Sequence, residues 1–205
     1  MLKIILNFLF PQKCLGCGKE NEIFCPKCLT KTDRADLPED NGVFAAANYQ
    51  DGVLKKAVWM LKYKGVSQLA EPLAELLKER VWQKVQSKLK SDDVIVIPVP
   101  LSGRRSRQRG FNQAELIARR LSSNVLTNAL YKTVHTDSQV NVKDREKRLN
   151  NVKGSFAVKN AELIKGKEII LVDDICTTGA TLKEAKKVLK ESGAKKVLAV
   201  VVARG

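Results

Sequence analysis

The chain contains 205 residues, and its 44% hydrophobic and 29% charged content is typical of a soluble globular protein. That length provides one main hydrophobic core and a small appendage. The 37 Lys and Arg residues outnumber the 22 Asp and Glu residues, which gives a net charge of +15. Such an excess indicates a polyanionic partner (nucleic acid, a membrane surface or a phosphorylated substrate), or only a soluble basic protein.

Residues 1–10, MLKIILNFLF, are apolar but are not typical of a signal peptide or a membrane span. The run is too short to cross a bilayer, and Pro-Gln-Lys-Cys follows it instead of a small-residue cleavage site. We expect a helix that docks on the folded domain. Because no other segment could span a membrane, the sequence predicts a cytoplasmic protein without an integral membrane segment.

Two closely spaced pairs of cysteines come next, in the pattern C-x2-C-x7-C-x2-C: Cys14, Cys17, Cys25 and Cys28. Two such pairs can place four thiolates around one tetrahedral Zn²⁺. Disulfides are the alternative, but a cytoplasmic location disfavours them, and a redox C-x-x-C motif needs no second pair. We therefore predict a structural zinc ribbon, without zinc catalysis, that forms with its polar linker a unit at residues 1–40.

The main domain is expected at residues 41–205 and begins with a predicted strand at 43–49. A helix capped by Asp51 follows, and its terminal lysines, Lys62 and Lys64, are expected to be solvated rather than to face a phosphate. A long amphipathic helix is predicted from Ser67 to Leu89, because leucine and valine recur there at helical spacing.

A second buried strand is predicted at residues 94–100, and the loop after it, residues 101–110, is rich in arginine: Arg104, Arg105, Arg107 and Arg109. Guanidinium groups bind phosphate bidentately, so this loop is a candidate phosphate site. A solvated basic loop is the alternative. The next helix adds Arg119 and Arg120 to the same basic patch.

Residues 169–181, IILVDDICTTGAT, form the segment around which the chain is organised. The apolar run 169–172 is typical of a parallel strand that is covered on both faces. Asp173 and Asp174 follow at its carboxyl end, where open α/β sheets place their ligands. Small residues then lead into a predicted helix: Thr177, Thr178, Gly179, Ala180 and Thr181.

This segment suits a sugar phosphate. The backbone amides and the dipole at a helix N-terminus favour an anion, and Gly179 lets the backbone close on it. Two carboxylates would repel a phosphate, so we expect them to accept hydrogen bonds from sugar hydroxyls. The segment is neither a P-loop nor a dinucleotide fingerprint, because it lacks G-x-x-x-x-G-K-[ST] and G-x-G-x-x-G. The alternative is an ordinary strand–loop–helix unit with two solvated aspartates.

LVDDICTTGAT resembles the fingerprint with which type I phosphoribosyltransferases (PRTases) bind phosphoribosyl pyrophosphate (PRPP). IPVP at 97–100, RGFNQAELIARRL at 109–121 and the N-terminal cysteines resemble the ComF/ComFC competence family within that superfamily. Together with the alternation of predicted strands and helices, this resemblance implies an α/β fold with an open, mostly parallel sheet flanked by helices and a small N-terminal Cys₄ zinc ribbon.

The resemblance also implies roles for individual residues. Asp173 and Asp174 would be the carboxylates that hold the ribose and serve catalysis, residues 177–181 would hold the 5-phosphate, and Arg104 and Arg105 would hold pyrophosphate with Mg²⁺. Residues 132–153 would form a mobile hood that excludes water. Three hood residues fit the pattern of the family: Arg145, Arg148 and Asn151.

Three functions remain open. The first is a competence protein that keeps the PRPP or ribose 5-phosphate pocket and acts in DNA uptake with single-stranded DNA (ssDNA) and a ComFA-like ATPase or recombination mediator. The second is an active PRTase that modifies an unidentified base or amine, and the third is a PRPP-sensing regulator. Direct binding of ssDNA would use the arginines of residues 101–110. Since aromatic residues are only 5% of the chain, we expect base stacking to contribute little.

Overall fold

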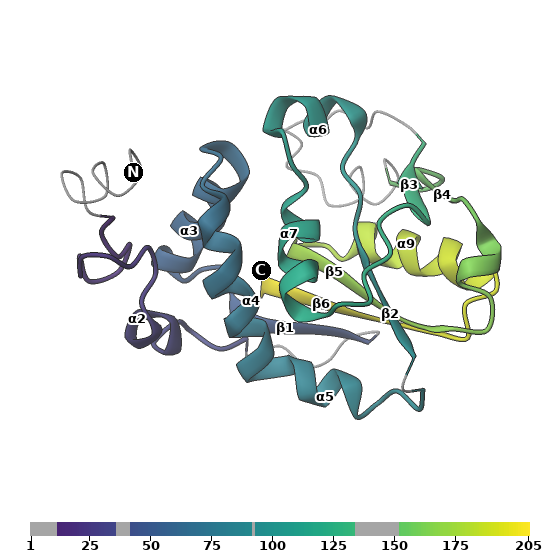
Figure 1. The fold of residues 1–205 in the computed structure, drawn as a ribbon, viewed down its shortest axis with the longest axis horizontal. Helices are drawn as coiled ribbons and strands as arrows, with labels where there is room; N and C mark the ends of the chain where they lie inside the picture. The colour runs from purple at the N-terminus through teal and green to yellow at the C-terminus, as the bar shows by residue number, and fades with distance from the viewer. Residues whose placement is uncertain (1–11, 36–41, 92, 134–151) are drawn as a thin grey trace.

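The structure is a computed structural model that describes residues 12–35, 42–91, 93–133 and 152–205. Its centre is a sheet of four parallel strands in the order β1-β6-β5-β2, and Figure 1 shows helices on both faces of this sheet. The strands are β1 (Val43–Asn48), β2 (Val94–Pro98), β5 (Glu168–Cys176) and β6 (Lys196–Arg204). The predicted α/β class with a parallel sheet is confirmed.

The central strand β5 is buried on both faces. Ile170 and Val172 belong to a core that includes side chains of α3 (Gly52–Tyr63), α4 (Ala70–Leu77) and α7 (Gln113–Leu121). Ile169 and Leu171 belong to the core on the opposite face, beneath α9 (Ala180–Glu191). Because side chains alternate across a strand, a strand covered on both sides needs an apolar residue at every position. This explains the unbroken run IILV.

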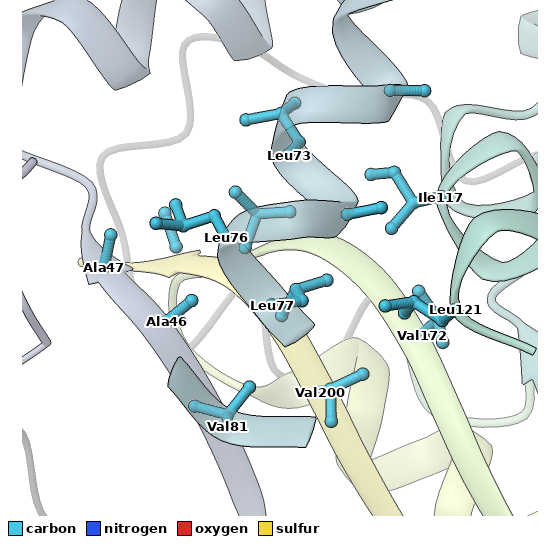
Figure 2. Close-up of a cluster of buried hydrophobic side chains, with 14 of the residues drawn as sticks. Ala46, Ala47, Leu73, Leu76, Leu77, Val81, Ile117, Leu121, Val172 and Val200 are labelled. Atoms are coloured by element: carbon cyan, nitrogen blue, oxygen red, sulfur yellow. The ribbon is translucent and has the colours of Figure 1, made fainter. Parts of the chain in front are cut away.

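The first core is closed by α4 and α7. In Figure 2, Leu77 of α4 and Ile117 and Leu121 of α7 lie above Val172 and Val200 of the sheet. Four of these five side chains are almost completely buried, and Leu121 is 8% exposed. The leucine spacing on the two helices therefore matches the apolar surface of one face of the sheet.

The long helix predicted from residue 67 is present as consecutive helical segments. These are η1 (Ser67–Leu69), α4, the π-helical η2 (Lys78–Trp82) and α5 (Gln83–Gln86). The last segment ends at Gln86, so Leu89 packs against the core from beyond the helix. The helix before it is also confirmed, because Asp51 caps α3 by accepting a hydrogen bond from the Leu54 N–H at 2.8 Å.

One local prediction was wrong, and one strand was not predicted. Residues 101–110 were expected to be a loop, but most of them form the helix α6 (Gly103–Arg109). Its ends carry ordinary helix signals, because Ser102 accepts a hydrogen bond from the Arg105 N–H at 3.5 Å and Gly110 adopts a left-handed φ of 76°. The strand β3 (Leu130–Lys132) was not predicted at all. It pairs antiparallel with β4 (Phe156–Val158), outside the main sheet, and a short η3 (Ala161–Leu163) follows.

The cysteine-rich segment shares the main core. Cys14, Phe24, Cys25 and Leu29 are buried in the same cluster as the side chains of α4 and the sheet, and α2 (Pro26–Thr30) lies beside β1 and α4 in Figure 1. The helix predicted at residues 1–10 lies outside the described residues. Among the helices of the described ranges, none is long and apolar enough to cross a bilayer.

Arg80 joins the ribbon to the sheet. Its guanidinium donates hydrogen bonds to the backbone carbonyls of Thr30 at 3.1 Å, Thr32 at 3.0 Å and Ala46 of β1 at 3.1 Å. Burial lowers the pKa of Arg80, with a further contribution from the charge of Arg34. One side chain therefore satisfies carbonyls from two segments that are distant in sequence.

We predict that Arg80→Ala lowers the free energy of unfolding by about 2 kcal/mol, because charged hydrogen bonds are lost and buried carbonyls are left without donors. Urea denaturation followed by circular dichroism measures this change. Lys78→Ala on the same helix is the control, since Lys78 forms only an exposed ion pair with Glu75 at 2.7 Å. Equal effects of the two substitutions would contradict the role assigned to Arg80.

Candidate functional site

The four N-terminal cysteines converge on one point. Their sulfur atoms all lie within 4.8 Å of one another, and all four are free thiols. Cys17 Sγ and Cys25 Sγ are 3.7 Å apart. That distance is too long for a disulfide, but it matches the edge of about 3.8 Å expected of a tetrahedron with Zn–S bonds of about 2.3 Å. The donor set and spacing therefore fit a tetrahedral metal ion such as Zn²⁺.

Backbone geometry around these cysteines supports a close sulfur cluster. A Cβ atom at Gly16 would lie 2.7 Å from Cys28 Sγ, so only glycine fits there. Burial acts to raise the pKa of Cys14, but hydrogen bonds from backbone N–H groups, first that of Cys25, outweigh it and lower the pKa to about 6. Burial and the neighbouring sulfurs raise the pKa of Cys28 to about 12. A cation among the four sulfurs would relieve this repulsion.

A second polar cluster lies at the carboxyl-terminal end of β5, where Asp173 and Asp174 are still part of the strand. Strand alternation sends their side chains to opposite faces of the sheet. Asp174 Oδ1 forms an ion pair with Lys62 Nζ of α3 at 2.8 Å, and its side chain is 3% exposed. Its other oxygen, Oδ2, is buried and has no hydrogen-bond partner among the described residues. A buried, unpartnered carboxylate oxygen is costly, and it marks a place for a donor or a cation from a ligand.

Asp173 occupies the other face of the strand. Its Oδ1 accepts a hydrogen bond from the Asp174 N–H at 2.8 Å. Burial, followed by the negative charge of Asp174, raises the pKa of Asp173 to about 7. Lys132 of β3 is close enough to interact electrostatically with Asp173 and with Arg105, while burial lowers the pKa of Lys132. Lys62 of α3 therefore pairs directly with Asp174 and also acts on Asp173 through its charge, while Lys132 of β3 interacts with Asp173.

The small residues after β5 turn the chain into α9. Gly179 adopts a left-handed φ of 75° immediately before the helix, and Ala180 is its first, buried residue. Thr178 Oγ1 accepts a hydrogen bond from the Ala180 N–H at 3.4 Å. Thr177 is exposed, whereas Thr178 and Thr181 are half-buried. The first-turn amides of a twelve-residue helix thus follow the two aspartates after the short turn at residues 177–179.

The arginines of α6 differ in their surroundings. Arg104 and Arg107 are exposed, and Arg105 and Arg109 are half-buried. Arg109 donates a hydrogen bond to Gln113 Oε1 at 3.0 Å. The motif RGFNQA has a structural explanation in this region. Its glycine ends α6, and Asn112 caps α7 by accepting from the Ala114 N–H at 3.1 Å while donating to the Val99 carbonyl at 3.0 Å.

The basic patch is smaller than predicted. Arg119 pairs with Glu115 at 2.8 Å, and Arg120 pairs with Glu71 of α4 at 2.5 Å. These two arginines are neutralised by acidic neighbours, so the patch reduces to α6. Three predicted hood residues lie outside the described residues: Arg145, Arg148 and Asn151. The hairpin β3–β4, whose register pairs Lys132 with Phe156, flanks that segment.

Two lysines of this site escaped the sequence-based prediction. Lys62 was expected to be solvated, but it is 17% exposed and paired with Asp174, so that expectation was wrong. Its position four residues after the buried Val58 was the available signal, because i and i+4 share a helix face. Lys132 had no comparable signal, since its position depends on the unpredicted strand β3.

A cavity of about 500 Å³ lies beside the turn that leads into α9. It is lined by Thr178, Gly179 and cationic side chains of α9 that include Lys183 and Lys187, but by neither aspartate. The turn at residues 177–179 therefore borders this cavity and also follows the strand that carries the two aspartates.

Comparison with known proteins places these features in a family. Residues 65–205 match the family model described as phosphoribosyl transferase domain. Competence protein F of Haemophilus influenzae is 32% identical over 198 residues, covering 92% of this chain and 82% of that protein. Competence protein ComFC of Streptococcus pneumoniae is 31% identical, with 88% and 79% covered, and DNA utilization protein YhgH of Escherichia coli K12 is 30% identical with the same coverage.

The family match includes β2, α6, β5 and α9, which carry the aspartates, the threonine-rich loop and the arginines. The resemblance inferred from LVDDICTTGAT and RGFNQA is thus confirmed by relatives that align along nearly the whole chain. The chain belongs to the phosphoribosyltransferase-domain family, in the group that contains Competence protein F and ComFC.

Proposed function

We propose that the carboxyl-terminal end of β5 and the N-terminus of α9 bind PRPP or ribose 5-phosphate, and that the protein acts in the cytoplasm in DNA uptake or utilization. The observation that carries the pocket is the buried Asp174, which has one oxygen on Lys62 and the other without a partner in the part of the chain that the structure describes. A sugar hydroxyl is a donor of suitable size and charge for that oxygen. The neighbouring helix N-terminus suits the phosphate of the same molecule.

In this arrangement Asp173 and Asp174 accept hydrogen bonds from the ribose hydroxyls, and residues 177–181 surround the 5-phosphate. Arg104 and Arg105 face the pyrophosphate, with Arg145, Arg148 and Asn151 contributing from the hood. Mg²⁺ suits this site because it binds through substrate phosphate oxygens and few protein carboxylates. When bound, it would neutralise the diphosphate.

An active transferase is the second candidate, and Lys132 favours it. This half-buried lysine interacts with Asp173 and Arg105, where a fixed positive charge would stabilise a departing pyrophosphate. Asp173 and Asp174 would then stabilise positive charge developing on the ribose. A PRPP sensor would use the same contacts without releasing pyrophosphate, so product release distinguishes the two.

The part in DNA uptake rests on the relatives, which are named for competence and DNA utilization, and on the charge of +15. The arginines of α6 would contact the phosphates of ssDNA: Arg104, Arg105, Arg107 and Arg109. A ComFA-like ATPase or a recombination mediator is the protein partner that fits this role. The same α6 arginines face pyrophosphate in the pocket, so PRPP and ssDNA are expected to compete where they share them.

PRPP with Mg²⁺ is predicted to raise the melting temperature of the protein by about 5–10 °C at about 100 times its Kd, through preferential binding to the folded state. Asp174→Asn and Thr178→Ala should lose most of this shift, because they remove a hydroxyl acceptor and a phosphate donor. Asp93→Asn, in an exposed ion pair with Lys167 near the start of β2, should keep it. Differential scanning fluorimetry measures all four proteins. A wild-type protein that shows no shift at millimolar PRPP would refute the pocket.

We also expect purified protein to contain about one Zn²⁺ per chain, bound by the four cysteines. Cys14→Ser or Cys28→Ser should lose the metal and increase hydrogen exchange in residues 12–35, since metal binding stabilises such small segments. Cys176→Ser is the control, because Cys176 is buried in β5, outside the cluster. Elemental analysis and hydrogen-exchange mass spectrometry provide the measurements. Metal-free protein with an intact ribbon would contradict the assignment.

Asp173 makes the stability of the free protein depend on pH. Its pKa is raised to about 7 in the folded protein, from 3.8, so the folded state holds a proton that the unfolded state has lost between these values. Stability should therefore fall as pH rises from about 4 to about 7. Asp173→Asn, which cannot ionise, should differ little from wild type near pH 4 and melt clearly higher near pH 8. Thermal melts at the two pH values test this, and a constant difference would contradict it.

A further inference from the structure

The outer face of α3 presents two aromatic side chains to solvent. Trp59 is 47% exposed and Tyr63 is 60% exposed, although large apolar rings usually avoid water. They are four residues apart and therefore lie on one face of the helix. Their ring centroids are 6.2 Å apart with an interplanar angle of 43°. These rings form a pair of adjacent flat surfaces outside the hydrophobic core.

Cations from α3 and α6 surround the rings. Lys64 Nζ lies 5.3 Å from the centroid of Trp59, and the Arg109 guanidinium of α6 lies 5.1 Å from that of Tyr63. Arg109 is also fixed by its hydrogen bond to Gln113, so its plane is held over the tyrosine. The contact between Tyr63 and Arg109 makes the exposed sides of the two helices one continuous surface, and both helices lie on the upper side of the view in Figure 1.

Charge on this surface has a single sign. Residues 52–64 carry four lysines and residues 101–110 carry four arginines, and neither segment contains an acidic residue. Of these four lysines, only Lys62 points inward, where it forms an ion pair with Asp174. Aromatic rings that alternate with cations, without intervening acids, combine stacking surfaces with attraction for a phosphate backbone.

We propose that Trp59 and Tyr63 form a stacking platform for the bases of single-stranded DNA, whose phosphates lie along Lys55, Lys56 and Lys64 of α3 and the arginines of α6. This deepens the proposed function and rests on its DNA-binding part, not on the PRPP pocket. It also differs from the expectation that stacking contributes little: the aromatic content is low, but two of the aromatic residues are exposed together in the basic surface. Free bases suit such a platform, since every base has a flat face.

The experiment separates stacking from attraction to phosphate. Wild-type protein should bind an oligothymidylate more tightly than an abasic oligodeoxyribose phosphate of the same length. In the Trp59→Ala/Tyr63→Ala double variant, affinity for the oligothymidylate should fall about tenfold or more, while affinity for the abasic strand stays unchanged. Trp59→Phe/Tyr63→Phe should retain the preference for bases. Fluorescence anisotropy of labelled strands gives the affinities.

Two controls make the result specific. Tyr131→Ala removes another exposed tyrosine with a lysine over its ring, Lys159 at 5.1 Å, and should leave DNA binding unchanged. Since the chain has two tryptophans, Trp82→Phe leaves Trp59 as the only one, and its fluorescence should be quenched by the oligothymidylate. The thermal shift with PRPP in the double variant reports the pocket independently, so loss of one activity is distinguishable from loss of the other.

Equal wild-type affinity for the two strands, or a preference for bases that persists in the double variant, would overturn the platform. Unquenched Trp59 fluorescence at saturating oligothymidylate would do the same. Absence of any DNA binding would overturn it together with the DNA-binding part of the proposed function, while leaving the PRPP pocket intact if the thermal shift is present.

Discussion

The ion pair between Asp174 and Lys62 is the contact on which the arrangement of the candidate site depends. From Ile169 to Val172 β5 is apolar on both faces, and the next two residues carry carboxylates into a region that is still largely dry. A buried carboxylate is stable only with a partner, which α3 provides as Lys62 at 2.8 Å. This pairing fixes α3 beside the end of β5, and the other oxygen of Asp174 has no hydrogen-bond partner within residues 12–35, 42–91, 93–133 and 152–205. The strand that organises the core thus also places a buried carboxylate oxygen where a ligand could donate a hydrogen bond.

The same constraint explains how much could be predicted from the sequence. Some features depend only on residues that are close in sequence. The run IILVDD indicates a strand buried on both faces, the small residues before α9 indicate a tight turn, and the paired cysteines have the spacing of metal ligands. The same kind of local pattern predicts the parallel strands, the helix cap at Asp51 and the leucine-rich helix. Those predictions agree with the structure.

What could not be predicted depends on contacts distant in sequence. Lys62 is a partner of Asp174 across 112 residues, and only the packing of α3 against β5 shows that it is not solvated. Lys132 reaches the site through a three-residue strand whose partner, β4, lies beyond residue 151. The helix α6 was missed because arginine and glycine suggested a loop, although Ser102 and Gly110 carry the usual cap signals. Arg120 loses its place in the basic patch for a similar reason, since Glu71 of α4 reaches it only in the fold, whereas the partner of Arg119, Glu115, lies four residues away on the same helix.

Adjacent residues of α3 serve the two proposed sites, and helix geometry explains why. Lys62 continues the inward side of the helix after Val58 and reaches Asp174, whereas Tyr63 is turned outward by about 100° and meets Arg109 of α6. α6 likewise contributes to both regions, since Arg105 lies near Lys132 and Arg109 lies over Tyr63. These two helices therefore connect the proposed pocket for a small phosphorylated sugar with the proposed surface for a phosphate polymer. Both proposed sites depend on positive charge. A bound sugar phosphate would therefore weaken the attraction for ssDNA, and the reverse, where the two ligands share arginines. This holds even though the bases and the ribose contact different residues.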